Sequence, residues 1–294
     1  MVVVYNMQRE APRTLYSLSA EYQDADANQY EVIVVENGST RPLSQQRVEQ
    51  MGSNFRYFYL EDAPASPAYA VNFGVQQARG PMVGVMIDGA RIVTPGIVQT
   101  VMRAYRAYEN PLVSTLAWHI GPDIQYRAIK EQGYNTAIED ELLDQSEWMA
   151  DGYRLFDIST LGGSSADGWL MPTAESNCLF LLRTMYEKLG GFDERFDMPG
   201  GGLVNLDFYR RACEYHDTVL IVMLGEGSFH QMHGGIMTNQ YEQAYRSKLG
   251  PQYREITGRR FQPPVKKPVY WGNIHRYMLP SLQESVQKVL DMDS

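Results

Sequence analysis

The sequence predicts an α/β fold with a mixed, mostly parallel sheet flanked by helices, because three observations agree. Strand-like apolar runs alternate with helix-like runs over residues 1–116, and this alternation implies βαβ units with right-handed crossovers. Residues 82–87 form an apolar run between Gly80-Pro81 and Gly89, as expected of a strand buried on both faces. With 294 residues, 44% of them hydrophobic, the chain can bury a large core.

The first part of the chain supplies the alternating elements. Strands are expected at 1–5, 30–35, 55–60, 82–87 and 112–116. Helices are expected at 11–22, 44–51 with Ser44 as the cap, 67–78 and 92–110. Because each helix lies between two strands, we expect most of these strands to run parallel.

The remainder of the chain is less regular. Residues 121–172 are polar and weakly periodic, which predicts surface helices within 126–149 and a functional loop. The acids at 139–144 are expected to form a solvated face. Strands follow at 176–182 and 218–224, and helices at 184–189, 206–215 and 280–290. We therefore expect one domain over 1–250 and a C-terminal extension over 251–294, whose closing helix packs on that domain.

Composition excludes several classes of function. A formal net charge of −9 argues against a nucleic-acid partner, which requires a broad basic face. No stretch of about 18 apolar residues is present, so no transmembrane segment is expected. The first residues read as a strand rather than a signal peptide. Cys178 and Cys213 lie in apolar or helix-like runs, which favours free thiols in a reducing cytoplasm.

Asp88 follows the apolar run directly. Ligands of open α/β sheets bind outside the carboxyl ends of the strands, where a carboxylate can hold a metal, a hydroxyl or a proton. Asp-Gly is also common turn chemistry. From this segment alone the two interpretations are equally good.

Further segments place Asp88 in a larger pattern. In chain order they are Tyr5-Asn6, 36–39, 72–80, 88–90, Gly190-Gly-Phe-Asp-Glu194 and 229–235. This order resembles the family 2 glycosyltransferases of the GT-A fold, and the resemblance runs from Met1 to about Gly235. The segment 190–194 matches the family pattern without change.

The resemblance implies a GT-A domain that moves a sugar from a nucleotide-diphosphate sugar to a hydroxyl of a glycan or lipid-linked acceptor, with inversion. Such an enzyme would work in the cytoplasm or at the inner face of a membrane. A nucleotidyltransferase is disfavoured because no glycine-rich loop follows the first strand. A degenerate GT-A domain that binds a nucleotide or glycan without catalysis stays open.

Residues for the donor follow from the matched positions. Glu36 would accept a hydrogen bond from the base, or is a strand-end turn residue. Asn72 would steady the diphosphate or ribose, or caps a helix. The full set implied for the donor is Tyr5, Asn6, Glu36, Asn72, Asp88 and Arg91.

The metal site departs from the family pattern. The family carries a second acid two residues after the first, where this chain has Ala90, and an alanine cannot ligate a cation. A divalent cation, Mn²⁺ or Mg²⁺, would then be held by Asp88 with His233 and His230. A structural role for these histidines is the alternative.

The position of the catalytic base departs from the family pattern as well. Where the family carries Glu-Asp, this chain has Val204-Asn205, and asparagine does not accept a proton at neutral pH. Asp207 is the nearest acid and is either the base or the N-cap of a helix. Glu175 is a second candidate. The catalytic set implied is therefore Asp207, Glu175 and Asn205.

Overall fold

The structure is a computed structural model that describes residues 1–235 and 243–292. A parallel three-stranded sheet in the order β1-β2-β3 forms the N-terminal part. Its strands and helices are β1 Val2–Val4, α1 Ala11–Tyr16, β2 Val32–Asn37, α2 Gln45–Glu49, β3 Phe55–Leu60 and α3 Ala68–Gln76. Ser44 caps α2, as predicted, by accepting a hydrogen bond from the backbone N–H of Arg47.

The second sheet is larger and has the order β10-β9-β6-β8-β4, with β5 paired to β9 and β7 paired to β6. Its strands are β4 Met82–Val85, β5 Arg91–Val93, β6 Pro111–Ile120, β7 Ser159–Leu161, β8 Leu179–Leu182, β9 Val219–His230 and β10 Val269–Gly272. Strand β9 runs parallel to β6 and β10, whereas β8 is antiparallel to β4 and β6. A parallel bridge between Val2 and Met86 joins the two sheets.

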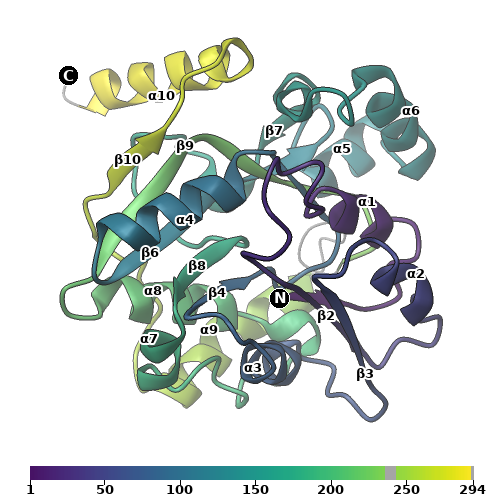
Figure 1. Ribbon diagram of the computed structural model, residues 1–294. Coiled ribbons are helices and arrows are strands. Elements are labelled where there is room, and N and C mark those ends of the chain that lie inside the picture. Colours follow the sequence, from purple (N-terminus) through teal and green to yellow (C-terminus); the bar gives the residue numbers. More distant parts are fainter. Residues whose placement is uncertain (236–242, 293–294) are drawn as a thin grey trace.

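Helices cover both faces of the larger sheet (Figure 1). Helix α4 Ile97–Ala107 covers one face, and α7 Arg183–Lys188 and α8 Val204–Glu214 cover the other. The other helices of this part are α5 Gln125–Gln132, α6 Thr136–Ser146, α9 Gln243–Thr257 and α10 Leu279–Met292. Short 3-10 helices lie at Gly152–Ile158, Gly163–Ser165, Pro199–Gly201 and Arg276–Met278. This arrangement confirms the predicted fold, a mixed α/β sheet flanked by helices.

The central strand β6 is buried along its whole length because alternate side chains enter two different cores. Leu112 packs with α3, α7 and α8 on one face. Its neighbour Val113 packs with Ile97 and Val101 of α4 on the other face. Burial on both sides leaves the ends of the strands as the places where polar side chains can gather.

Several element boundaries differ from the prediction. The strand before Asp88 ends at Val85, and residues 92–93, predicted as the start of a helix, belong to β5. The pairing of β5 with β9 explains this difference, because a partner more than a hundred residues away outweighs local helix periodicity. Strands β6 and β9 are longer than predicted, and α9 was not predicted.

The C-terminal segment contacts the main body at defined points. Helix α9 spans the boundary predicted at residue 250, so we propose that the extension begins after Thr257. Trp169 is fully buried, and its backbone N–H and indole N–H donate to the hydroxyls of Ser285 and Ser281 on α10, at 2.9 and 3.0 Å.

In the described part of the chain no helix has the length and apolar character needed to cross a membrane.

Trp169 is therefore expected to anchor α10. Trp169→Ala should destabilise the protein by about 3–5 kcal/mol, because it removes a buried ring and the indole hydrogen bond to Ser281. Ser281→Ala, which removes one hydrogen bond, should cost only about 1 kcal/mol. Urea unfolding followed by circular dichroism measures both, and equal unfolding midpoints for the two variants would contradict this role.

Candidate functional site

The loop after β4 and the end of β9 meet because β5 pairs antiparallel with β9, with Arg91 opposite His230. Asp88 lies three residues before Arg91 on this loop. One carboxylate oxygen of Asp88, Oδ1, accepts a hydrogen bond from the backbone N–H of Ala90 at 2.8 Å. The other oxygen, Oδ2, faces Nε2 of His230 at 3.0 Å and Nε2 of His233 at 3.7 Å. The turn thus orients the carboxylate toward both histidines.

Three potential ligand atoms converge at this point. The two histidine Nε2 atoms are 3.1 Å apart, and the ligand atoms of Asp88, His230 and His233 all lie within 4.8 Å of one another. One carboxylate oxygen and two imidazole nitrogens suit a divalent transition metal. The residues that the sequence assigns to the metal are therefore adjacent in space and fit such an ion.

The protonation states of the cluster also suit a cation. Burial lowers the pKa of His230 to about 4, although Asp88 opposes this shift. Burial alone would raise the pKa of Asp88, but the two histidines and Arg91 outweigh it and hold that pKa well below its usual range. Near neutral pH the cluster thus contains an ionised carboxylate and a neutral imidazole at His230, and both can ligate a metal.

Arg91 lies beneath this cluster. Its Nε is 3.7 Å from Asp88 Oδ2, and both Nε and Nη1 are buried with no hydrogen-bond partner among the residues that the structure describes. A buried guanidinium without an acceptor is costly. Ala90, in the position of the missing acid, is fully buried in the core beside α1 and α4. No side-chain ligand can come from that position.

The polar donor-side residues at the ends of β1 and β2 form hydrogen bonds with the loop 39–43. Asn6 has a φ of 53°, and its side-chain oxygen accepts from the backbone N–H of Arg41 at 3.0 Å. Glu36 is fully buried and accepts from the Ser39 hydroxyl and the Leu43 backbone N–H. Tyr5 is exposed. Both polar side chains shape the loop 39–43, and their contacts with a donor stay predictions.

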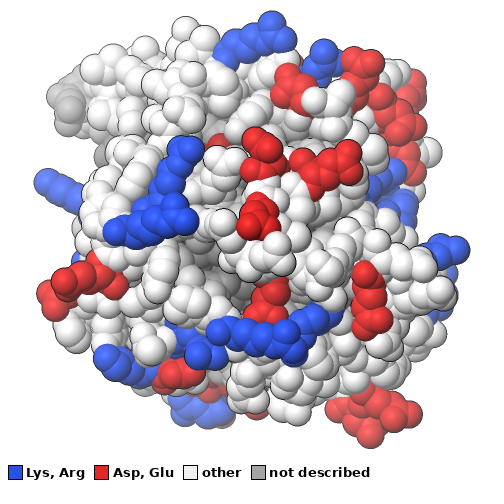
Figure 2. All heavy atoms as spheres, in the orientation of Figure 1, with Lys and Arg blue, Asp and Glu red and all other residues white. Residues whose placement is uncertain are grey.

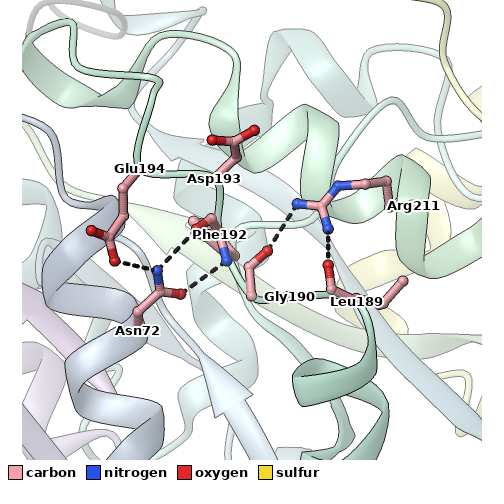
Figure 3. A pocket seen from close by; sticks show the side chains of 8 residues that line it. Asn72, Leu189, Gly190, Phe192, Asp193, Glu194 and Arg211 are labelled. Atoms are coloured by element: carbon pink, nitrogen blue, oxygen red, sulfur yellow. Dashed lines mark hydrogen bonds between the residues drawn. The ribbon is translucent and has the colours of Figure 1, made fainter. Parts of the chain in front are cut away.

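Asn72 lies away from the cluster, in a pocket with the segment 190–194 (Figure 3). Its amide nitrogen donates to the carbonyl of Phe192 at 2.9 Å and to Glu194 Oε1 at 2.7 Å. Its amide oxygen accepts from the backbone N–H of Phe192 at 2.9 Å and from the Tyr186 hydroxyl. Every hydrogen-bonding position of the amide is thus used to join α3 to the segment that follows α7.

Asn205 and Glu175 are adjacent. The side-chain amide of Asn205, in the first turn of α8, donates to Glu175 Oε2 at 2.7 Å. Asn205 also donates to the carbonyl of Ser176 and the side chain of Asn177. Its own side-chain oxygen is buried without a partner in the described parts of the chain. Glu175, which lies in the segment before β8, is therefore beside the position to which the resemblance assigns the catalytic base of the family.

Asp207 points elsewhere. Asp207 is two positions after Asn205, which is a rotation of about 200° around the helix. Asp207 Oδ2 accepts from Arg211 Nε at 2.6 Å, and Oδ1 accepts from the Tyr253 hydroxyl of α9 at 3.1 Å. The interpretation of Asp207 as an N-cap is wrong, because α8 begins at Val204 with Leu203 as the N-cap.

Glu139 is a residue that sequence reasoning missed. Acidic side chains do gather over α5 and α6 (Figure 2), as predicted for 139–144, but Glu139 itself is fully buried. It accepts from the backbone N–H of Met232, between the two histidines in the chain, and from Arg9. Burial raises its pKa to about 7, although the Met232 hydrogen bond and Arg9 oppose the shift. A cluster of acids on a helix carries no signal that one of them turns inward.

Comparison with known proteins agrees with this fold. The family model described as glycosyl transferase family 2 matches residues 1–161. No curated protein matches the sequence as a relative. Solved structures share the fold at low sequence identity, so the similarity shows only the architecture of the chain.

Three of these structures are informative about length and shape. S. aureus TarS superposes with a TM-score of 0.51 at 15% identity, over 86% of this chain and 42% of that one. TarS 1–349 in complex with UDP-GlcNAc gives a TM-score of 0.50 at 14% identity, over 87% and 71%. The mannosyltransferase PcManGT from Pyrobaculum calidifontis in complex with GDP-Man and Mn²⁺ gives 0.51 at 15%, over 98% and 68%. The chain thus spans less than half of that TarS chain.

Asn72 offers a direct test of its structural contacts. Asn72→Asp keeps the shape but replaces the amide donor by a second carboxylate against Glu194, so we expect a loss of about 1–3 kcal/mol of stability. Urea unfolding gives the free energy, and calorimetry with UDP and GDP gives nucleotide affinity. A large loss of nucleotide affinity at unchanged stability would instead favour the predicted contact with the donor.

Proposed function

The chain belongs to glycosyl transferase family 2, and on this premise we propose that it transfers a sugar from a nucleotide-diphosphate sugar to a hydroxyl acceptor. The observation that carries the proposal is the convergence of Asp88, His230 and His233 at one end of the larger sheet. This is the place where an open α/β sheet binds its ligand.

We propose that Asp88, His230 and His233 hold a divalent cation. When bound, the cation would neutralise the charge that develops on the leaving diphosphate. Two imidazole nitrogens favour Mn²⁺ over Mg²⁺, which prefers oxygen ligands. The fixed positive charge of Arg91 would add to this stabilisation from beneath the site.

Glu175 is the base that the contacts support best. It is only partly buried, and Asn205 holds one of its oxygens, which leaves the other for an acceptor hydroxyl. The proton of that hydroxyl would pass to Glu175 as the hydroxyl oxygen attacks the anomeric carbon and the bond to the diphosphate breaks. In-line attack of this kind inverts the anomeric carbon. Asp207 is less suited because Arg211 and Tyr253 engage both of its oxygens.

On the donor side, Tyr5, Asn6 and Glu36 with the loop 39–43 would receive the nucleotide. The structures of two similar proteins contain UDP-GlcNAc and GDP-Man, and we propose a donor of this class. The acceptor would be a glycan or a lipid-linked precursor, which places the reaction in the cytoplasm or at the inner face of a membrane.

A binding module without catalysis is the second candidate. It is favoured by Ala90 and Asn205, which stand where the family carries two carboxylates. Binding of nucleotide without turnover for any donor would support it.

The metal site predicts a specific loss of cation affinity. His233→Ala should weaken Mn²⁺ binding at least about tenfold, because it removes one of three ligands. His216→Ala is the matched control, since His216 is an exposed histidine paired with Asp217. Calorimetry with Mn²⁺ and with Mg²⁺, in the presence of UDP or GDP, measures both. Equal affinities of the two variants would exclude this ligand set.

If Glu175 is the base, its replacement should lower turnover. Glu175→Gln should lower kcat about 10²–10⁴-fold with little change in donor KM, whereas Glu187→Gln, a change on the exposed side of α7, should leave kcat unchanged. Release of UDP or GDP from UDP-GlcNAc or GDP-Man reports turnover. Should Asp207→Asn lose turnover while Glu175→Gln keeps it, the base is Asp207.

A further inference from the structure

A buried network supports the metal site from behind. We propose that Glu139, acting through Gln125, is a positioning residue that keeps the Nε2 lone pair of His230 directed toward Asp88. As far as it concerns metal binding, this role rests on the proposed function. Gln125 faces Nδ1 of His230 rather than Nε2, and Glu139 bonds to Gln125 and to the backbone of Met232, so their effect is on the geometry of the histidines.

Glu139 is the centre of the network. Its two oxygens accept from the backbone N–H of Met232 at 3.0 and 2.8 Å, and Oε1 accepts from Arg9 Nη2 at 2.6 Å. Oε2 also accepts from Gln125 Nε2 at 3.3 Å and from the Tyr134 hydroxyl at 3.3 Å. A carboxylate is an acceptor only, so it can satisfy all of these donors together, which an amide cannot.

These contacts fix the orientation of the Gln125 amide. Its nitrogen donates to Glu139 and to the backbone carbonyl of His230 at 2.9 Å. Both groups are acceptors, and an amide turned over would place its oxygen against them. The amide oxygen of Gln125 therefore faces Nδ1 of His230, at 2.7 Å.

The tautomer of His230 follows from this orientation. Because a carbonyl oxygen accepts, Nδ1 of His230 carries the proton and Nε2 keeps its lone pair. That lone pair lies 3.0 Å from Asp88 Oδ2. Two acceptors at this distance repel each other unless a cation lies near both. The network thus holds His230 in the form that ligates a metal.

The same network pins the backbone between the two histidines. Glu139 accepts from the N–H of Met232, and Arg9 Nη2 donates to the carbonyl of Met232 at 2.9 Å. Arg9 also pairs with Glu139 itself at 2.6 Å. Glu139 of α6 and Arg9, which precedes α1, therefore hold both sides of this peptide segment. The position of His233 relative to His230 depends on these two side chains.

Two variants test the proposal, with one matched control. Glu139→Gln replaces one acceptor oxygen by an NH₂ donor, so this side chain can no longer accept from Met232, Arg9 and Gln125 together. Gln125→Met removes the acceptor for His230 Nδ1 without changing charge. Glu141→Gln is the control, because Glu141 is an exposed acid on the same helix α6 and pairs with Gln145. If Glu139→Gln does not fold, Gln125→Met tests the proposal alone.

Nitrogen chemical shifts of ¹⁵N-labelled histidines in the metal-free protein report the tautomer, and Mn²⁺ titration reports the affinity. Wild type and Glu141→Gln should show His230 with the proton on Nδ1. Both test variants should lose this tautomer and bind Mn²⁺ about 10–100-fold more weakly.

The outcomes separate the two proposals. A proton on Nε2 in the wild type, or variants that keep both the tautomer and the affinity of wild type, would overturn the positioning role. If the tautomer depends on Glu139 and Gln125 but the wild type does not bind Mn²⁺, the positioning role stands and the proposed metal site falls.

Discussion

The pairing of β5 with the end of β9 is the constraint on which the site depends. It sets Arg91 opposite His230 and brings the turn at Asp88 against the histidines that close β9. Gln231 extends this contact, because its backbone N–H donates to the carbonyl of Ala90 at 2.8 Å. Without these few backbone hydrogen bonds, the carboxylate and the imidazoles would belong to separate loops.

Two substitutions relative to the family pattern have neighbours that could compensate for them. Ala90 lies in the core and offers no ligand, while the histidines face the remaining acid from the opposite strand. Asn205 does not accept a proton, yet it holds Glu175 from the start of the β8 segment. In each case a functional group from a different element lies nearby, the histidines beside Asp88 and Glu175 beside Asn205. This arrangement favours an altered active site over a lost one.

Two of the polar residues that the sequence assigns to the active site make structural contacts instead. Asn72 matches the family pattern, yet its amide is fully used by the segment 190–194. Asp207 lies near the matched base position but pairs with Arg211 and Tyr253. Desolvated polar groups need partners, and these contacts supply them. A match in sequence pattern therefore identifies the position of a residue in the fold more securely than its role.

The sequence by itself determined the fold class, the family and the membership of Asp88, His230 and His233 in one region, because apolar periodicity and motif order are local properties of the chain. Tertiary structure alone decided the pairing of β5, the inward turn of Glu139 and the contact of Asn205 with Glu175. Each of these joins residues distant along the chain. Local patterns do not record which partner a strand edge or a buried carboxylate meets, since that choice is made by long-range packing.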